Sequence, residues 1–383
     1  MFLCLPLDIK TNILIEKKRR YDLDWLRVIA ILAVYLHHIG MPFNGDEFHI
    51  MNSENSKLLD DIMVFFEQLR LPLLFLISGT GTIFAFSKRT WVHFIKERSI
   101  RLMVPLIFGT LFIVPPQTYY ENINAYTSYI DVYKNGSFDT NHLWFIENLF
   151  IMSILLIPLI LALKSSKLDR FVHLIDTVAS RKYGILLWVL PLITITVLLK
   201  KIYPDDSKDI TNLSSTFYYG YFFVSGMFFT TSKNIWNYLK GYRSFNFRAF
   251  IISFILFYGY YLLPNAYVEP YFTISNRWDI WYLVCALVSW TLVTTLLGYG
   301  QVWFNKKSTL LIKSNEAIYP FYILHQTVII VLGYYIIQMD WGIVLKIMVL
   351  ILTSFPLIIA IYKLLIYPFK IPRMLFGMKT KMD

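Results

Sequence analysis

The feature that most constrains this chain is a series of long apolar segments. About 20 mostly apolar residues cross the ~30 Å hydrocarbon core of a bilayer as an α-helix. A soluble domain is about one quarter charged, whereas this chain is 56% hydrophobic and only 16% charged. We therefore predict an all-α, polytopic membrane bundle with about ten transmembrane helices. The expected spans lie near 25–43, 64–86, 100–116, 143–163, 184–202, 216–231, 247–264, 278–298, 317–337 and 343–366.

The distribution of positive charge predicts the orientation of these spans. Most of the 36 lysine and arginine residues fall in alternate connecting segments, which the positive-inside rule assigns to the cytoplasm. Both termini are then cytoplasmic. The net charge of +11 lies on inner loops facing anionic lipid, so a nucleic-acid partner is not expected. The predicted parts are a cytoplasmic segment 1–24, a ten-helix domain 25–366 and a cytoplasmic tail 367–383.

The same features predict a multi-pass protein of a cell membrane, most simply a bacterial plasma membrane. Its two cysteines, Cys4 and Cys285, lie far apart and match no metal-ligand spacing or disulfide framework. We therefore expect no metal site.

Ionisable side chains within a span are costly and commonly mark a functional site. The first span contains DWLRVIAILAVYLHHIG, from Asp24 to Gly40. Arg27 and His38 are about three helical turns apart, so they share a helix face and differ in depth by roughly 16 Å. His37 points about 100° away from that face. His38 is thus expected near mid-membrane; a packing role for both imidazoles is the alternative.

Two arginines precede the third span. In FIKERSIRLMVP, Arg98 and Arg101 are i and i+3 and are predicted to share a helix face. Paired guanidinium groups at the cytoplasmic mouth could bind phosphates of a nucleotide-like donor. Alternatively, the pair anchors the helix at the membrane surface.

The string HLWFIENLF begins at His142 and leads into the fourth span. It contains Trp144, and Glu147 falls about one turn into the membrane, where an unpaired carboxylate is costly. Its expected partner is a histidine in the outer half of the membrane. The alternative is a carboxylate that reaches the outer surface.

The ninth span contains NEAIYPFYILHQT, which ends at Thr327. His325 and Gln326 lie about two turns inside it, and Tyr322 is the i−3 neighbour of His325 on the same face. Pro320 is expected to kink or start this helix. A structural contact between His325 and Tyr322 is the alternative to a catalytic role.

At these residues the sequence resembles the acyltransferase type 3 family of integral membrane proteins. It is most similar to the branch that includes glucan succinyltransferases of osmoregulated glucan synthesis. The matching strings occur in family order and extend over nine of the ten predicted spans. They are LDWLRVIAILAVYLHH, LFLISGTGTIFAF, FIKERSIRLMVPLIFG, HLWFIENL and NEAIYPFYILHQTVII.

The resemblance implies a bundle that transfers an acyl group from cytoplasmic acyl-CoA to a hydroxyl of an extracytoplasmic carbohydrate. It assigns the catalytic histidine to His38, preceded by Arg27, and the arginine pair to Arg98 and Arg101. Acetyl-CoA or succinyl-CoA would be a co-substrate, not a permanently bound cofactor. The Trp-to-Glu spacing before Glu147 is shorter than in many family members.

Residues and resemblance together give a hypothesis for the site. The donor binds to Arg27, Arg98 and Arg101, His38 acts as general base, and Glu147 is a second catalytic candidate. A covalent acyl-histidine is an open alternative to direct transfer. Acceptor-binding or supporting residues are Asp24, His142, Trp144, Tyr322, His325 and Gln326.

Two other functions fit the same polar residues. A proton-coupled transporter of a glycan or small molecule would also need intramembrane histidines, and inverted repeats would support it. We find no internal repeat. An assembly or export partner without catalysis is the other possibility.

The predicted topology can be tested by labelling single cysteines with a membrane-impermeant reagent in intact cells. Residues of the 117–142 loop should be labelled, whereas cysteines at Lys88, Lys164, Lys240 and Lys306 should be protected. Labelling at position 240 without permeabilisation would contradict the ten-span arrangement.

Overall fold

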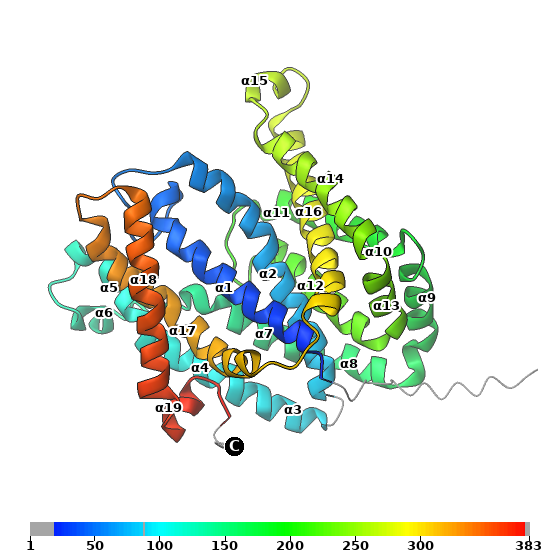
Figure 1. The fold of residues 1–383 in the computed structure, drawn as a ribbon, viewed down its shortest axis with the longest axis horizontal. Helices are drawn as coiled ribbons and strands as arrows, with labels where there is room; N and C mark the ends of the chain where they lie inside the picture. Colours follow the sequence, from blue (N-terminus) through cyan, green and yellow to red (C-terminus); the bar gives the residue numbers. More distant parts are fainter. Residues whose placement is uncertain (1–18, 87–88, 380–383) are drawn as a thin grey trace, which may run out of the picture.

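The computed structural model describes residues 19–86 and 89–379, and helices account for 80% of the structure. Within those ranges there is no β-strand. Helices occupy all ten predicted ranges, which confirms the all-α fold class. α1 and α2 cross the middle of the molecule, and the α14–α16 pair projects from it with α15 at its tip (Figure 1).

Six of the predicted spans are single helices in the described structure, and the other four are broken into shorter helical segments. The unbroken ones are α1 (Tyr21–Asn44), α2 (Lys57–Phe86), α12 (Leu213–Thr231), α14 (Arg243–Tyr261), α16 (Ile274–Trp303) and α17 (Thr309–Ile337). The fourth, fifth and tenth ranges contain α7 (Trp144–Leu155) with α8 (Ile157–Lys164), α10 (Gly184–Leu187) with α11 (Val189–Ile202), and α18 (Ile343–Ile361) with η6 (Tyr362–Ile366).

The third range is the most segmented. It runs through α3 (Trp91–Arg98), η1 (Ser99–Met103), α4 (Val104–Phe108), η2 (Gly109–Ile113) and α5 (Pro115–Glu121). Both η1 and η2 are π-helical turns, which occur frequently at functional sites. The connecting elements are η3 (Ile123–Ala125), α6 (Ile130–Lys134), η4 (Asn141–Leu143), η5 (Ser166–Leu168), α9 (Asp169–Ala179), α13 (Lys233–Gly241), α15 (Asn265–Val268) and α19 (Lys370–Leu375).

Not every predicted span has the length and apolarity of a membrane helix. Among the described residues, seven helices do, or eight if the pair at 141–164, bent by 48°, is one span. α12 and α14 fall outside this set: α12 is rich in Ser, Thr and Tyr, and α14 begins with Arg, Ser and Asn. The membrane-bundle class is therefore shown, and the count of ten remains a prediction.

Two helix starts differ from the expected spans. α2 begins at Lys57, before the apolar run near residue 64, and α17 begins at Thr309. Pro320 consequently lies within α17 and does not start it. A helix can extend beyond the hydrocarbon at both ends, so an apolar window marks only part of it.

Close backbone contact joins α2 to α12, the helix against which α2 packs most extensively. A Cβ on Gly79 would lie 1.9 Å from the carbonyl oxygen of Phe223, and one on Gly226 would lie 2.0 Å from that of Leu76. The Thr80 hydroxyl donates to the Gly226 carbonyl at 3.1 Å. Small residues allow such close approach between membrane helices.

Large apolar side chains point outward around the bundle. Only 22% of the apolar window of the last span is buried, and Val344 and Leu352 are 70% and 72% exposed. In water such a surface would be unfavourable, whereas lipid tails are an apolar solvent for it.

The described part of the predicted tail packs against the bundle. Arg373, on α19, is buried and binds Glu316 of α17 at 3.0 Å. Phe376 is buried against the ring of Phe108. This end of the chain therefore covers the side of the molecule on which α3 lies (Figure 1).

The glycine contact between α2 and α12 predicts a large effect of small substitutions. Gly79→Ala should lower the thermal stability and the yield of monodisperse detergent-extracted protein, because the added carbon would overlap the Phe223 carbonyl. Gly259→Ala, on α14, is the control, since nothing lies within 4 Å of the position that its added methyl group would occupy. Equal melting temperatures for the two variants would contradict the close contact.

Candidate functional site

A cavity of about 230 Å³ opens among α1, α2, α3, η1, α7 and α12 on the side predicted to be cytoplasmic. Three of its charged residues are arginines, Arg27, Arg98 and Arg101, and the fourth is Glu97. The structure thus brings together in one cavity the three residues predicted to bind a donor. Their excess positive charge suits an anionic ligand.

The arginine pair is held by neighbours on α2 and α3. Arg98 donates to the Thr82 hydroxyl at 2.9 Å, and Arg101 Nε lies 3.7 Å from Glu97. Arg98 ends α3, and Arg101 lies in the π-helical turn that follows. The pair is therefore not on a regular α-helix, yet both side chains still reach the cavity.

Arg27 approaches the same cavity from α1. It binds Asp24 at 3.0 Å and Asn315 of α17, while its buried Nε has no hydrogen-bond partner. The buried Ser153 hydroxyl, also in the cavity wall, has no partner either. Buried polar atoms are normally paired, so these two are free to bind a polar ligand. Asp24 thus forms an ion pair with Arg27 and lies about four helical turns along α1 from His38.

The two histidines predicted on different spans meet in the bundle. His38 Nδ1 lies 2.8 Å from His325 Nε2, and the two rings stack with centroids 5.0 Å apart. His325 is buried, whereas His38 is half-buried and stacks against Phe48. His325 Nδ1 lies 2.5 Å from the carbonyl oxygen of Tyr322.

These contacts assign the protons of the neutral histidine pair. A carbonyl only accepts, so His325 Nδ1 must carry its proton and its Nε2 must be the acceptor. His38 Nδ1 then donates to that acceptor, which leaves His38 Nε2 with a lone pair. This is the protonation state that a general base requires.

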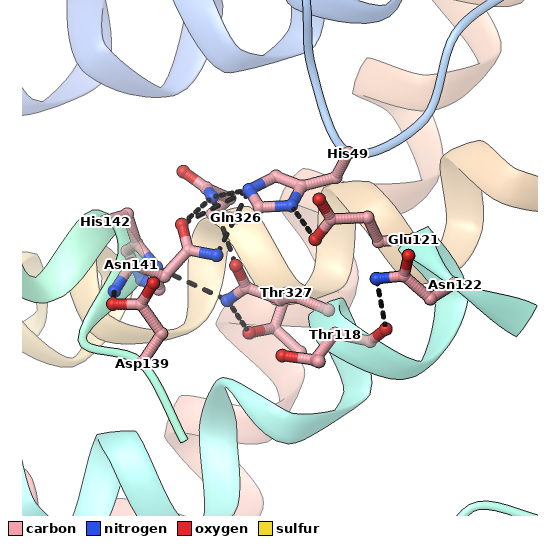
Figure 2. A network of polar contacts seen from close by, with 10 residues as sticks. His49, Thr118, Glu121, Asn122, Asp139, Asn141, His142, Gln326 and Thr327 are labelled. Carbon is pink, nitrogen blue, oxygen red and sulfur yellow. Dashed lines mark hydrogen bonds and ion pairs between the residues drawn. The ribbon is translucent and has the colours of Figure 1, made fainter. Parts of the chain in front are cut away.

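A second polar cluster lies beside the histidine pair and joins side chains from the α1–α2 loop, α5, the segment before α7, and α17 (Figure 2). Gln326 donates to Asn141 at 2.8 Å and to Gln117 at 3.1 Å. His49, from the loop between α1 and α2, binds Glu121 at 2.7 Å and also contacts Asn141 and Gln326. Each member thus has partners from other segments, and the cluster ties the loops together.

His142 connects this cluster to the histidine pair. Its Nε2 donates to the Ile323 carbonyl at 3.1 Å, its Nδ1 faces Gln117 at 3.3 Å, and its ring lies 5.3 Å from that of His325. The Tyr322 hydroxyl donates to the His142 carbonyl. His142, Tyr322 and Gln326 therefore lie where supporting residues were predicted, although their contacts do not establish a role in acceptor binding.

Sequence reasoning missed four members of the cluster. These are His49, Gln117, Glu121 and Asn141, all in or next to the outer loops. Polar residues are ordinary at such positions, so their type alone gave no signal. Asn141 adopts a left-handed backbone with φ 46°, which asparagine tolerates better than most residues.

Glu147 does not have the expected partner. No hydrogen bond or ion pair joins it to a histidine in the part of the chain that the structure describes; its neighbours are Thr140, Asp139 and Asp209. It lies half-buried in the first turn of α7, where the helix dipole favours an anion. A catalytic role for Glu147 remains a prediction without a contact to support it.

Trp144 lies on α7, and Arg70, which sequence reasoning missed, lies on α2. Trp144 packs 5.5 Å from the ring of Tyr219 and 6.3 Å from that of Phe75. Arg70 is buried on α2, within the second predicted span, and His37 lies near its neighbour Glu67 at 4.0 Å. A charge so deep in a predicted span was the signal that could have identified Arg70.

His37 and His38 point to different surroundings, as the helical phase predicts. His38 contacts α17, whereas His37 faces α2. Among the described residues, no group of three or more His, Cys, Asp or Glu side chains could hold a metal ion.

Comparison with known protein families identifies a match over most of the chain. The family described as an acyltransferase domain, Acyl_transf_3, matches residues 20–363, nearly the whole chain. The match includes every site residue described above. No curated protein and no solved structure matches the chain.

Proposed function

Because the chain belongs to the Acyl_transf_3 family of membrane acyltransferases, we propose that it transfers an acyl group from cytoplasmic acyl-CoA to a hydroxyl of an extracytoplasmic carbohydrate. The observation that carries this proposal is the arrangement along α1. An arginine-lined cavity lies at its inner end, and a histidine with a free lone pair lies about three turns further out.

The donor is bound through its phosphates. Arg98 and Arg101 have N–H groups beyond those that face Thr82 and Glu97, which can form charge-assisted hydrogen bonds with phosphate oxygens, and Arg27 adds its unused Nε. The pantetheine arm then follows α1 and α2 toward His38, which places the thioester at mid-depth. Acetyl and succinyl groups are both compatible with this arrangement.

His38 acts as the general base. Its Nε2 takes the proton of the acceptor hydroxyl while the hydroxyl oxygen attacks the thioester carbon. The C–S bond then breaks, and the same proton passes to the departing CoA thiolate. General-base catalysis of this kind typically contributes 10²–10⁴-fold. His325 holds the required tautomer through the Tyr322 carbonyl.

The acceptor enters from the outer side, past the cluster around Gln326 and His49 (Figure 2). Amide, imidazole and carboxylate groups there resemble those that proteins use to bind sugar hydroxyls. Gln117, Glu121 and Asn141 of this cluster belong to the segment from 117 to 142, which is rich in Tyr, Asn and Asp. Comparing cell-surface glycans by mass spectrometry, with and without the gene, would identify the acceptor and the acyl group.

Loss of either cavity arginine should weaken donor binding. Arg98→Ala or Arg101→Ala should raise the KM for acyl-CoA, since each removes charge-assisted hydrogen bonds worth roughly 1.5–3 kcal/mol. Arg101→Lys should restore binding only in part, because the planar fork is lost. Steady-state kinetics on purified protein would measure the change.

Lys96→Ala is the matched control for the arginine variants. Lys96 lies on the same short helix but is exposed and outside the cavity wall. If the arginine variants and this control have the same KM for acyl-CoA, Arg98 and Arg101 do not bind the donor. They would then only anchor the helix at the membrane surface.

His38 and His37 form a pair of adjacent residues with opposite expected effects. His38→Ala should leave the protein folded but reduce transfer at least about 10²-fold, because the base is removed. His37→Ala should lose much less, since its ring faces α2. Rates should be normalised to monodisperse detergent-extracted protein. Near-normal transfer by His38→Ala with none by His37→Ala would reverse the assignment.

A further inference from the structure

Arg70 is a buried cation with an unused donor. The residue is only 7% exposed, and its Nη1 has no hydrogen-bond partner in the described structure. Its ion-pair contact is loose: Nη2 lies 3.7 Å from an oxygen of Glu67, whose side chain is 47% exposed. A buried guanidinium is normally fully paired, so the free N–H groups of Arg70 indicate a missing ligand.

Other buried cations near the bundle surface are satisfied. Lys346 donates to Asn52 at 2.7 Å and to the Ile337 carbonyl at 2.9 Å. Arg373 binds Glu316 and donates to two backbone carbonyls. Arg70 therefore differs from them in its hydrogen bonding and not only in its depth.

The position of Arg70 connects it to the reaction centre. α1 and α2 are antiparallel neighbours: Gly40 meets Met63 near the outer side, and Arg27 and Gly81 line the same inner cavity. Arg70 is thus at a depth similar to that of His38. Its charge lies within electrostatic range of the rings of His38 and His325.

A second unused polar atom lies beside Arg70. His37 is 6% exposed, its Nδ1 has no partner, and its Nε2 lies 4.0 Å from the same Glu67 carboxylate. Tyr219 also lies within electrostatic range of the Arg70 guanidinium. Arg70 Nη1 and His37 Nδ1 are thus two buried, unpartnered nitrogens at this interface, and the ring of His37 lies 5.7 Å from that of His38.

Attack of a hydroxyl on a thioester creates negative charge on the carbonyl oxygen. The C–O bond forms, the π electron pair of the carbonyl moves to its oxygen, and His38 Nε2 takes the hydroxyl proton. When the pair returns, the C–S bond breaks and CoA leaves as the thiol after receiving that proton. A donor aimed at this oxygen stabilises the transition state more than the bound substrate.

We propose that Arg70 is a catalytic residue whose Nη1 donates to the thioester carbonyl oxygen as negative charge develops on it. This inference rests on the proposed acyl transfer. Arg70 then differs in function from the cavity arginines: they hold the phosphates of the donor, and Arg70 acts in the chemical step. Placing its charge in a site of low dielectric makes the interaction stronger than it would be in water.

The test separates binding from turnover in the full-length protein reconstituted in lipid nanodiscs. The probes are acetyl-CoA and succinyl-CoA with neutral oligosaccharides as acceptors; release of the CoA thiol gives kcat, and calorimetry gives the Kd of each donor. Arg70→Met should lower kcat about 10²–10³-fold while the Kd changes less than about threefold. Arg70→Lys should recover part of kcat, because it keeps the charge without the planar fork.

Lys346→Met is the matched control, since it removes a buried but fully paired cation. It should lower the melting temperature while kcat per folded molecule stays near that of the wild type. If Arg70→Met does not fold, Arg70→Lys carries the test, with kcat reduced at least about tenfold at unchanged Kd.

Folded Arg70→Met with the kcat of the wild type would overturn the inference. So would an increase in Kd with kcat unchanged, which would make Arg70 a donor-binding residue. If the wild-type protein itself releases no thiol from either donor, the proposed acyl transfer fails and this inference fails with it. Loss of thiol release in the Arg70 variants alone, with an active wild-type protein, would instead leave the proposed acyl transfer intact.

Discussion

The carbonyl oxygen of Tyr322 can only accept a hydrogen bond, and this determines which ring nitrogens of His325 and His38 carry protons. Because the carbonyl needs a donor, His325 carries its proton on Nδ1. Its Nε2 then accepts a hydrogen bond from His38 Nδ1. In water this preference would be slight, because solvent competes for every ring nitrogen. In a buried site there is no such competition, so the Tyr322 carbonyl oxygen on α17 sets the tautomer of His38 on α1.

A membrane interior also explains why the polar residues form a connected series. The cavity with Arg27, the histidine pair and the cluster around Gln326 follow one another from the side predicted to be cytoplasmic toward the opposite side of the bundle. An isolated polar group at such depth is unfavourable, whereas a chain of paired groups is tolerated. The few unpaired atoms, such as Arg70 Nη1, are then informative, because nothing else in the described structure accounts for them.

Sequence reasoning located the helices and the most conspicuous charges, but not their partners. The i, i+11 relation of Arg27 and His38 follows from helix geometry alone, which is why their faces were predictable. The contact between His38 and His325 depends on how α1 packs against α17, and no local pattern encodes it. For Glu147 the sequence indicated a histidine partner, but the fold supplies the Thr140 hydroxyl and a helix N-terminus instead.

The close backbone contacts at Gly79 and Gly226, with Phe223 and Leu76 respectively, have a mechanical consequence. Two backbones that touch without intervening side chains cannot slide past each other unless the contact first opens, and α2 forms a wall of the arginine cavity while α12 forms another. Alternating access requires one bundle to rock against its neighbour. The tight contact between α2 and α12 therefore favours a mechanism without rocking of the bundle. The two substrates would move to the reaction centre while the helices keep their positions.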